Sequence, residues 1–389
     1  LPHHENLKSF GACFGVSGGY ERPMWFALDG EKAEYKYSYN YQSWYPSAEY
    51  ETYNTRKNVG LFDLTPFSKF EIKSDKAHQE LQKICTSNIK KDVGRCTYTH
   101  MLNSDAGIEA DLTVVSVDKN YFRIISSAAT RERDKHHIKK HLNKDIELKD
   151  VTDDYCVFGL FGPKSRDLIS SLCNNNFSNE NFRFGTAKFI SIEDTKIWTQ
   201  RLSYVGELGY ELYVEVKDAK KIYELIVNKG KDFNLSNCGM HAMDIMRMES
   251  GFLHWGHDIS PEENQYQAGL SFTISNKKNV DFIGKRALEK IDKKKIKTRF
   301  AMFTLKDSKP GEPLLLHDEP IYLKDQIIGK STSGNYSFNF KKNLTFGYIN
   351  NDYSNEQLKN SELFIEVEKK KYEIEIINQP LKQTNFKNN

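Results

Sequence analysis

The sequence lacks the signatures of several large functional classes. It contains no GxSxG nucleophile elbow, no GxxxxGK[ST] phosphate loop, no HExxH zinc motif and no GxGxxG after a strand. Each of these motifs carries a defined chemistry, so their absence disfavours serine hydrolases, P-loop enzymes, zinc proteases and dinucleotide-binding proteins. We therefore expect no FAD site within this chain.

Long apolar runs and paired cysteines are also missing. No stretch approaches the roughly 20 apolar residues that cross a bilayer, and the N-terminus has no basic-then-apolar signal pattern. The six cysteines are scattered without a CxxC or other short pairing, which indicates neither a zinc module nor a disulfide framework. We expect a protein without a membrane partner in a reducing compartment: cytoplasmic, or in the mitochondrial matrix if the source is eukaryotic.

Neither sign of charge is in clear excess. The 56 basic and 53 acidic residues are spread over the chain and leave a formal net charge of +3, so nucleic acid is not an expected partner. A length of 389 residues predicts more than one lobe, because single cores rarely exceed about 250 residues. The chain begins at Leu1 rather than Met, which predicts a processed chain or a piece of a longer polypeptide.

The hydrophobic periodicity predicts an α+β protein, because strands and helices alternate without a strict βαβ rhythm. A small all-β domain, a barrel or a sandwich, is expected at about 292–389, where short β-type runs are separated by Gly, Pro, Asp and Asn. We predict helices at 48–59, 76–85, 130–142, 164–173, 218–228, 239–250 and 283–290, and strands at 67–72, 97–102, 109–117, 121–127, 155–162, 196–206 and 209–216.

An acid stands within the strand predicted at 109–117. Asp111 alternates with the apolar residues Ala110, Leu112 and Val114, so its side chain falls on the opposite face of the strand. Spacing alone favours a solvated residue on the open face of a sheet, because buried carboxylates are uncommon. The competing interpretation is a functional acid.

A second candidate is the segment SYVGELGYELYV at 203–214. Its glycines Gly206 and Gly209 predict a tight turn into a strand that carries Glu211. One interpretation is a hairpin turn with a surface glutamate. The other is a carboxylate that accepts two parallel N–H donors from a planar heterocycle while Tyr204 lies against the ring.

The segment GFLHWGHDI at 251–259 contains two histidines, His254 and His257, at a ligand-like spacing of three. No further His or Cys accompanies them, so we expect no metal site. On the preceding helix, Asp244 and Arg247 have the spacing of an i,i+3 ion pair.

Several segments in order resemble one family. VGLFDLTPFSKFEI, VGRCTYTHMLNSDAGIEADLTVV, GLFGPKS, SYVGELGYELYV, ESGFLHWGHDI and DFIGKRALEK resemble the glycine-cleavage T-protein (aminomethyltransferase) superfamily. GACFGVSGGYERPMWFA and HWGHDI are most similar to the folate-binding C-terminal half of dimethylglycine and sarcosine dehydrogenases, and GKSTSGNYSFNFKKNLTFGYI resembles its C-terminal barrel. The resemblance implies a three-lobed α+β T-protein fold, with two lobes in residues 1–291 and a small β-barrel at 292–389.

The resemblance also implies a central channel for tetrahydrofolate. Asp111 aligns with the family aspartate that ends GGxxxD, and this match implies a catalytic role near the folate nitrogen that attacks a one-carbon unit. Glu211 aligns with the pterin-binding glutamate, and Tyr204 with a ligand-facing tyrosine of the dehydrogenase branch. FAD would belong to a separate or upstream domain, so a flavin dehydrogenase domain or subunit is the implied partner.

The implied function is tetrahydrofolate-dependent one-carbon transfer. An iminium or formaldehyde unit from the demethylation of an N-methyl glycine, of the dimethylglycine or sarcosine type, would be captured as 5,10-methylenetetrahydrofolate. Two alternatives stay open: a non-catalytic regulatory or scaffold protein on the same fold, and a true glycine-cleavage aminomethyltransferase. The sequence departs from the family at Met243, where classical T-proteins have a folate-contacting arginine, and at NQYQAGL (264–270), which replaces a TPLEAGL-like run.

Overall fold

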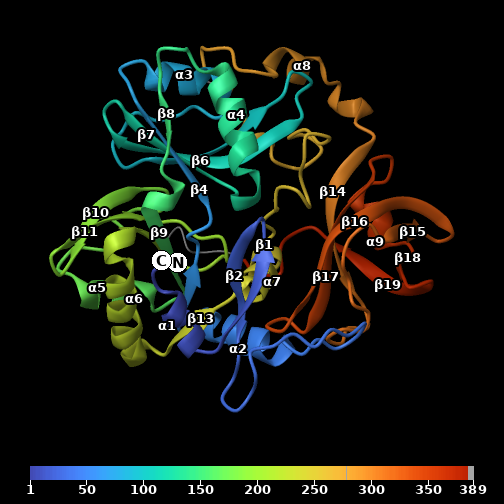
Figure 1. Cartoon of the computed structure of the whole chain (residues 1–389). Coiled ribbons are helices and arrows are strands. Elements are labelled where there is room, and N and C mark those ends of the chain that lie inside the picture. Colours follow the sequence, from blue (N-terminus) through green and yellow to red (C-terminus); the bar gives the residue numbers. More distant parts are fainter. Residues whose placement is uncertain (277, 384–389) are drawn as a thin grey trace.

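A computed structural model gives the structure of the protein and describes residues 1–276 and 278–383. Figure 1 shows three lobes around a central region: a first sheet at the top, a second sheet at the lower left and a closed barrel on the right. The predicted α+β class and the predicted C-terminal barrel are confirmed. No helix among residues 1–276 and 278–383 is long and apolar enough to cross a membrane.

The first lobe is a five-stranded sheet in the order β5-β6-β7-β4-β8. Its elements are β4 (Ser68–Lys73), α3 (Ala77–Ile84), β5 (Cys96–Leu102), β6 (Ile108–Asp118), β7 (Tyr121–Ser126), α4 (Arg131–His141) and β8 (Leu148–Asp150). One face of this sheet packs on helices α3 and α4, and the apolar residues Ala110, Leu112 and Val114 of β6 lie in that core. The predicted alternation along this strand is therefore confirmed.

The second lobe is a six-stranded sheet in the order β10-β11-β12-β9-β3-β13. Its elements are β3 (Val59–Asp63), β9 (Tyr155–Phe161), α5 (Ser165–Leu172), β10 (Ala187–Ile192), β11 (Thr195–Gln200), β12 (Gly209–Glu215), α6 (Val216–Gly230) and β13 (Leu235–Cys238). Residues of α5 and α6 form an apolar core with one face of this sheet, for example Leu168, Ile222 and Leu212.

The remaining faces of the two sheets meet in a third apolar cluster, which we call the seam. It combines Val115 and Val117 of β6 with Trp198 of β11 and Tyr213 of β12. Helix α7 (Met240–Glu249) adds methionines to the same cluster, among them Met243. The strands β1 (Ala12–Ser17) and β2 (Tyr20–Phe26) form a hairpin at the centre of Figure 1, and α1 (His4–Ser9) and α2 (Tyr45–Lys57) lie below it in that view.

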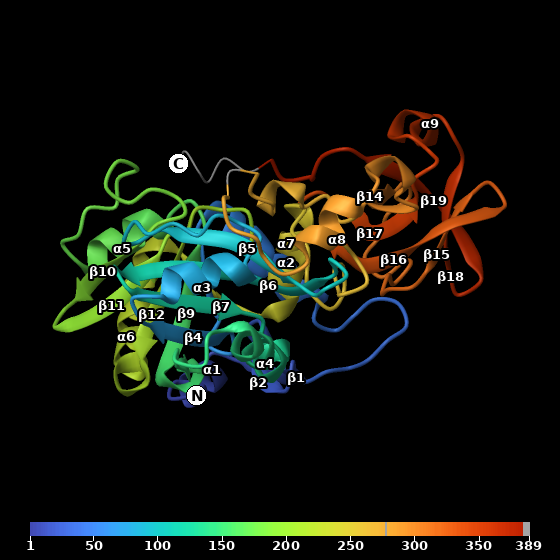
Figure 2. The ribbon, with the colours of Figure 1, turned by 90° about the horizontal axis from the view of Figure 1, so that it is seen from above.

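The third lobe is a closed barrel in the order β14-β17-β16-β15-β18-β19, seen at the right of Figure 2. Its strands are β14 (Thr298–Leu305), β15 (Pro320–Leu323), β16 (Gln326–Ser337), β17 (Lys342–Asn350), β18 (Leu363–Val367) and β19 (Lys370–Ile377). In the chain, α8 (Lys285–Lys290) precedes the barrel, and α9 (Asn355–Lys359) connects β17 to β18. Short 3₁₀ helices lie at Ala128–Thr130, Thr152–Asp154, Lys231–Phe233, Ser271–Thr273 and Lys293–Lys295. The domain boundary at 291/292 stays a prediction.

A buried arginine ties α7 to the barrel. Arg247 donates from Nη1 to Asp258 Oδ2 at 2.6 Å and from Nη2 to the hydroxyl of Ser333 on β16 at 2.8 Å. It also forms the predicted i,i+3 ion pair with Asp244, at 2.8 Å. The Asp244–Arg247 ion pair is therefore part of a wider polar network that joins α7 to the barrel.

Two local predictions were wrong. The strand predicted at 196–206 ends at Gln200, because the following loop turns at Gly206, with φ of 74°, before Gly209 pairs with Phe161. The helix predicted at 48–59 ends at Lys57, because Val59 already pairs with β13.

Candidate functional site

Asp111 and Glu211 lie on the faces of their two sheets that meet in the seam. Residues two positions apart on a strand point to the same side, so Asp111 shares a side with Val115, and Glu211 with Tyr213. Val115 and Tyr213 both belong to the seam cluster. Both predicted acids therefore lie on the sheet faces that meet in the seam, between the first and second lobes.

Asp111 is mostly buried, with 17% of its side chain exposed. Its Oδ1 has no hydrogen-bond partner within the part of the chain that the structure describes, and lies 3.6 Å from Nε2 of His100. Burial raises the pKa of Asp111 to about 7; the hydroxyl of Tyr98 opposes this rise, and the negative charge of Asp134 adds to it. The interpretation as a freely solvated strand residue is wrong, because the second sheet covers this face.

Glu211 lies in the interior of its sheet, with Gln200 of β11 on one side and Gly159 of β9 on the other. Its Oε2 accepts a hydrogen bond of 3.1 Å from the hydroxyl of Tyr213. Burial raises the pKa of Glu211 to about 7, and the bond from Tyr213 opposes that rise. A surface glutamate in a hairpin turn is therefore also a wrong description. The carboxylate can still accept further donors, since each oxygen has two acceptor sites.

Tyr204 reaches the seam from the loop between β11 and β12. Its hydroxyl donates to the carbonyl of Leu253 at 2.9 Å, and its ring stacks on Phe252 with a centroid distance of 6.0 Å. Burial raises the pKa of its phenol, and among the smaller effects the charge of Asp111 acts in the same direction. The ring is thus held in place near the predicted catalytic acid, in the cluster that also contains Tyr213.

The segment after α7 borders the seam. Trp255 donates from Nε1 to the carbonyl of Ile108, at the start of β6, at 3.0 Å, and the guanidinium of Arg133 lies 4.6 Å from the centroid of its ring. The rings of His254 and His257 are 4.6 Å apart. Over residues 1–276 and 278–383, no group of three or more His, Cys, Asp or Glu side chains is arranged to hold a metal ion.

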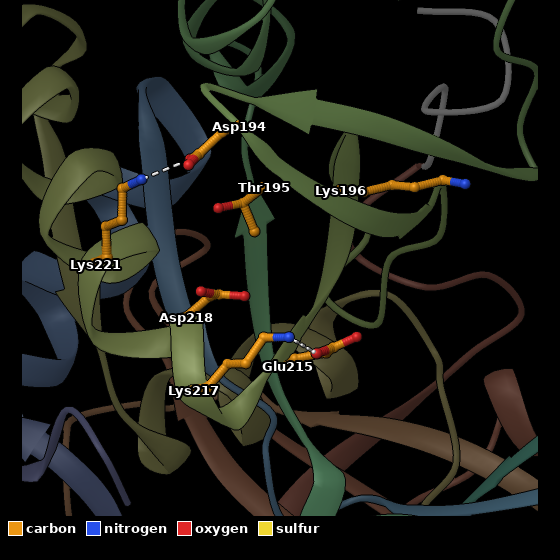
Figure 3. Close-up of a pocket in the computed structure, with 7 residues that line it drawn as sticks. All are labelled: Asp194, Thr195, Lys196, Glu215, Lys217, Asp218 and Lys221. Atoms are coloured by element: carbon orange, nitrogen blue, oxygen red, sulfur yellow. Dashed lines mark hydrogen bonds and ion pairs between the residues drawn. The ribbon is translucent and has the colours of Figure 1, made fainter.

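A shallow polar pocket lies elsewhere, where β11, β12 and α6 meet (Figure 3). It is lined by Asp194, Thr195, Lys196, Glu215, Lys217, Asp218 and Lys221. Lys221 pairs with Asp194 at 2.8 Å and Lys217 pairs with Glu215 at 2.7 Å, as the dashed lines in Figure 3 show. Because these charges compensate one another in the open, the pocket offers no strong reason for ligand binding.

Three groups beside Asp111 are not among the candidates predicted from the sequence. Tyr98 and His100 lie on β5, with His100 directly opposite Asp111 in the register, and Asp134 comes from α4. Pairing the segments before and after residues 103–107 as the two strands of a hairpin would have placed His100 close to Asp111. The bulge between Met101 and Leu102 shifts that register by one residue and hides the pairing.

Comparison with known proteins identifies the fold family. The model of the GCVT N-terminal domain matches residues 3–278, and that of the glycine cleavage T-protein C-terminal barrel domain matches residues 299–382. The chain belongs to the glycine cleavage T-protein family. The crystal structure of glycine cleavage system aminomethyltransferase T from Bartonella henselae superposes with a TM-score of 0.83 at 20% identity, over 98% of this chain and 97% of that one. The predicted T-protein fold is confirmed.

Curated relatives of this T-protein family chain include larger oxidising enzymes. It is 36% identical over 336 residues to 4-methylaminobutanoate oxidase (formaldehyde-forming) of Paenarthrobacter nicotinovorans, covering 86% of this chain and 40% of that protein. It is 32% identical over 371 residues to the mitochondrial dimethylglycine dehydrogenase of Rattus norvegicus, covering 94% and 42%. The chain thus spans about two fifths of the length of these relatives. The predicted resemblance to the dehydrogenase branch is confirmed.

Proposed function

We propose that this T-protein family chain is a tetrahydrofolate-binding one-carbon transfer module. It captures an iminium or formaldehyde unit, produced by oxidation of an N-methyl amine, as 5,10-methylenetetrahydrofolate. The observation that carries the proposal is the seam itself: it contains Tyr204, and its members Val115 and Tyr213 share their strand faces with Asp111 and Glu211. Family membership supports the same chemistry.

The chemistry of the seam fits a reduced pterin. Glu211 offers acceptor positions beyond its bond from Tyr213, and the 2-amino-4-oxo edge of a pterin presents adjacent N–H donors. The flat rings of Tyr204 and Tyr213 provide aromatic surface for a planar ligand. Met243, 3% exposed in the same cluster, supplies no charge, so the glutamate tail of a folate is held by other groups than in classical T-proteins.

Asp111 is the proposed catalytic group. Bound tetrahydrofolate supplies the nucleophilic amine for the one-carbon unit. A pKa of about 7 lets Asp111 accept a proton from an amine near neutral pH, and its ionised form would stabilise a nearby iminium cation in a mostly buried site. General acid–base assistance of this kind is worth roughly 10²–10⁴-fold in rate.

The source of the carbon is proposed from the relatives. Both are named for the oxidation of N-methyl or N,N-dimethyl amino acids, and the chain corresponds to about two fifths of their length. We therefore propose an N-methyl glycine of the dimethylglycine or sarcosine type as substrate, with oxidation performed by a flavin dehydrogenase domain or subunit that carries FAD outside this chain. The cytoplasmic or mitochondrial location stays a prediction.

A test is to follow the fate of the carbon. An N-methyl glycine dehydrogenase would oxidise its substrate with tetrahydrofolate present, and both free formaldehyde and 5,10-methylenetetrahydrofolate would be measured with and without this chain. We expect the chain to lower free formaldehyde and raise the folate product, and Asp111→Asn to abolish most of that difference. A regulatory or scaffold protein would change neither quantity, and a true glycine-cleavage aminomethyltransferase would respond only to an aminomethyl group on a lipoyl carrier.

A further inference from the structure

A chain of buried polar groups lies behind Asp111. His100, on β5, is fully buried, and its Nδ1 lies 2.9 Å from the hydroxyl of Thr273. The side-chain nitrogen of Gln265 lies 2.8 Å from the same hydroxyl and 3.2 Å from Nδ1. Gln265 belongs to the 264–270 run that departs from the usual family sequence. This difference from the family sequence therefore places the side-chain amide of Gln265 against the imidazole of His100, which faces Asp111.

The hydrogen bonds fix the tautomer of His100. The hydroxyl hydrogen of Thr273 is used in a 2.7 Å bond to the carbonyl of Leu270. The two hydrogens of the Gln265 amide go to its shorter contacts, the hydroxyl oxygens of Thr273 at 2.8 Å and Thr86 at 3.1 Å, which leaves none for Nδ1. The oxygen of Thr273 can then only accept from His100, and we assign the ring hydrogen to Nδ1. Burial lowers the pKa of His100 to about 3, which keeps the ring neutral. A neutral imidazole has one hydrogen on nitrogen, and Nε2 is therefore left with a bare lone pair.

That lone pair faces two oxygens. The hydroxyl of Tyr98 lies 3.3 Å from Nε2, and Oδ1 of Asp111 lies 3.6 Å from it. If Asp111 is ionised, the single hydrogen of Tyr98 must serve two acceptors, and one of them stays without a donor. If Asp111 is protonated, two hydrogens serve the three groups and each acceptor is satisfied. The arrangement thus favours the protonated form of Asp111 over the ionised form.

We propose that His100 is a positioning residue that keeps the proton taken up by Asp111 on the carboxyl, by accepting the hydrogen bond of that O–H group at Nε2, with Thr273 holding the ring hydrogen on Nδ1. The inference rests on the proposed role of Asp111 as a base. In the step, the N–H bond of the reacting amine breaks, its electron pair stays on nitrogen, and an O–H bond forms on Asp111. His100 stays neutral and accepts the hydrogen bond from that O–H group.

Other ionisable groups also face Asp111, and they come from separate elements. Tyr98 on β5 lowers the pKa of the carboxyl by donating to its charged form, and Asp134 on α4 raises it by repulsion. Tyr204 in the loop between β11 and β12 lies within range of the charge. All three remain when His100 or Thr273 is changed, so a change in the titration of Asp111 then reports the contribution of the imidazole.

The first test needs no substitution and no folate. In protein labelled with ¹⁵N-histidine, NMR distinguishes a ring protonated on Nδ1 from one protonated on Nε2. We expect His100 to be neutral with its hydrogen on Nδ1 at pH 6 to 8. A hydrogen on Nε2, or a doubly protonated ring, would overturn the proposal because the lone pair that accepts the hydrogen bond from Asp111 would not exist.

The second test titrates Asp111 by ¹³C NMR of labelled aspartate carboxyls, with the signal assigned by its loss in Asp111→Asn. His100→Leu keeps the site apolar but removes the acceptor, and we expect the pKa of Asp111 to fall by about 0.5–1 pH unit. Thr273→Val frees the ring to place its hydrogen on Nε2 and to donate to the ionised carboxylate, so we expect a fall as well. His317→Leu, at an exposed histidine just before β15, is the control and should change nothing.

The outcomes separate this proposal from the proposed function. An unchanged titration of Asp111 in both His100→Leu and Thr273→Val refutes the role of His100, whatever the protein binds. Thr273→Val keeps the test decisive if His100→Leu does not fold, because it is nearly isosteric and never contacts Asp111. Failure to bind tetrahydrofolate would instead refute the proposed function and leave both NMR results standing.

Discussion

Replacing Asp111 by Asn should increase stability while removing activity. The amide is nearly isosteric with the carboxyl, so the strand and the apolar core behind it are kept. The substitution removes a negative charge that the fold holds in a mostly buried position, and it removes the proposed proton acceptor. One substitution therefore tests two effects of the carboxylate, its contribution to turnover and its effect on the free energy of unfolding.

The structure gives the size and the sign of the stability effect. The pKa of Asp111 is raised from 3.8 to about 7, which at about 1.4 kcal/mol per pH unit is on the order of 4 kcal/mol. This is an upper bound, because 17% of the side chain reaches solvent. As the pH rises above about 4, the unfolded chain loses this proton first, so the wild type loses stability until the folded carboxyl also ionises near pH 7. Asn does not titrate and avoids this loss.

The assay is denaturant unfolding of both proteins without folate at pH 4 and pH 8. We expect similar free energies of unfolding at pH 4, and a variant more stable than the wild type by up to about 4 kcal/mol at pH 8. In the carbon-capture assay the same variant should keep much of its folate affinity and lose about 10²–10⁴-fold in turnover. Equal pH dependence in the two proteins, or unchanged turnover, would refute the account of Asp111.

Two further predictions concern neighbouring groups. The pKa of Glu211 is raised to about 7, and the N–H donors of a pterin favour its ionised form, so tetrahydrofolate binding at pH 6.5 should release protons. Proton release makes the calorimetric heat of binding depend on the ionisation enthalpy of the buffer. Heats that are the same in all buffers would contradict this prediction. Arg247→Met leaves Asp258 buried without its cation and should destabilise the protein by about 3–5 kcal/mol, measured by urea unfolding. A loss below about 1 kcal/mol would show that the network does not hold the barrel to α7.

The local pattern of β6 was sufficient to predict its two faces. Ala110, Leu112 and Val114 fill the core beneath α3 and α4, as their alternation required. The same pattern could not show that the opposite face is also covered, because the second sheet that covers it comes from residues far along the chain. The environment of Asp111 is a property of sheet packing, and only the family resemblance anticipated it.

Other parts of the site depended on single residues that override local propensity. The segment 196–206 was predicted as one strand, but the positive φ of Gly206 turns the chain, and Tyr204 lies in a loop. His100 stayed unnoticed because a bulge at Met101 and Leu102 shifts the hairpin register. Its contacts to Gln265 and Thr273 join segments more than 160 positions apart, which no local pattern encodes.

The most direct test of the central claim is the affinity of the chain for tetrahydrofolate. Isothermal titration at pH 8 would compare the wild type with Glu211→Gln and with the matched control Glu215→Gln, on the same strand but 54% exposed and paired with Lys217. We predict binding to the wild type and to Glu215→Gln with equal affinity, and a loss of about 1–3 kcal/mol in Glu211→Gln, because an amide must present a donor to the N–H groups of the pterin. Equal affinity in all three proteins would contradict the assignment of the site, and absence of binding to the wild type would contradict the proposed function.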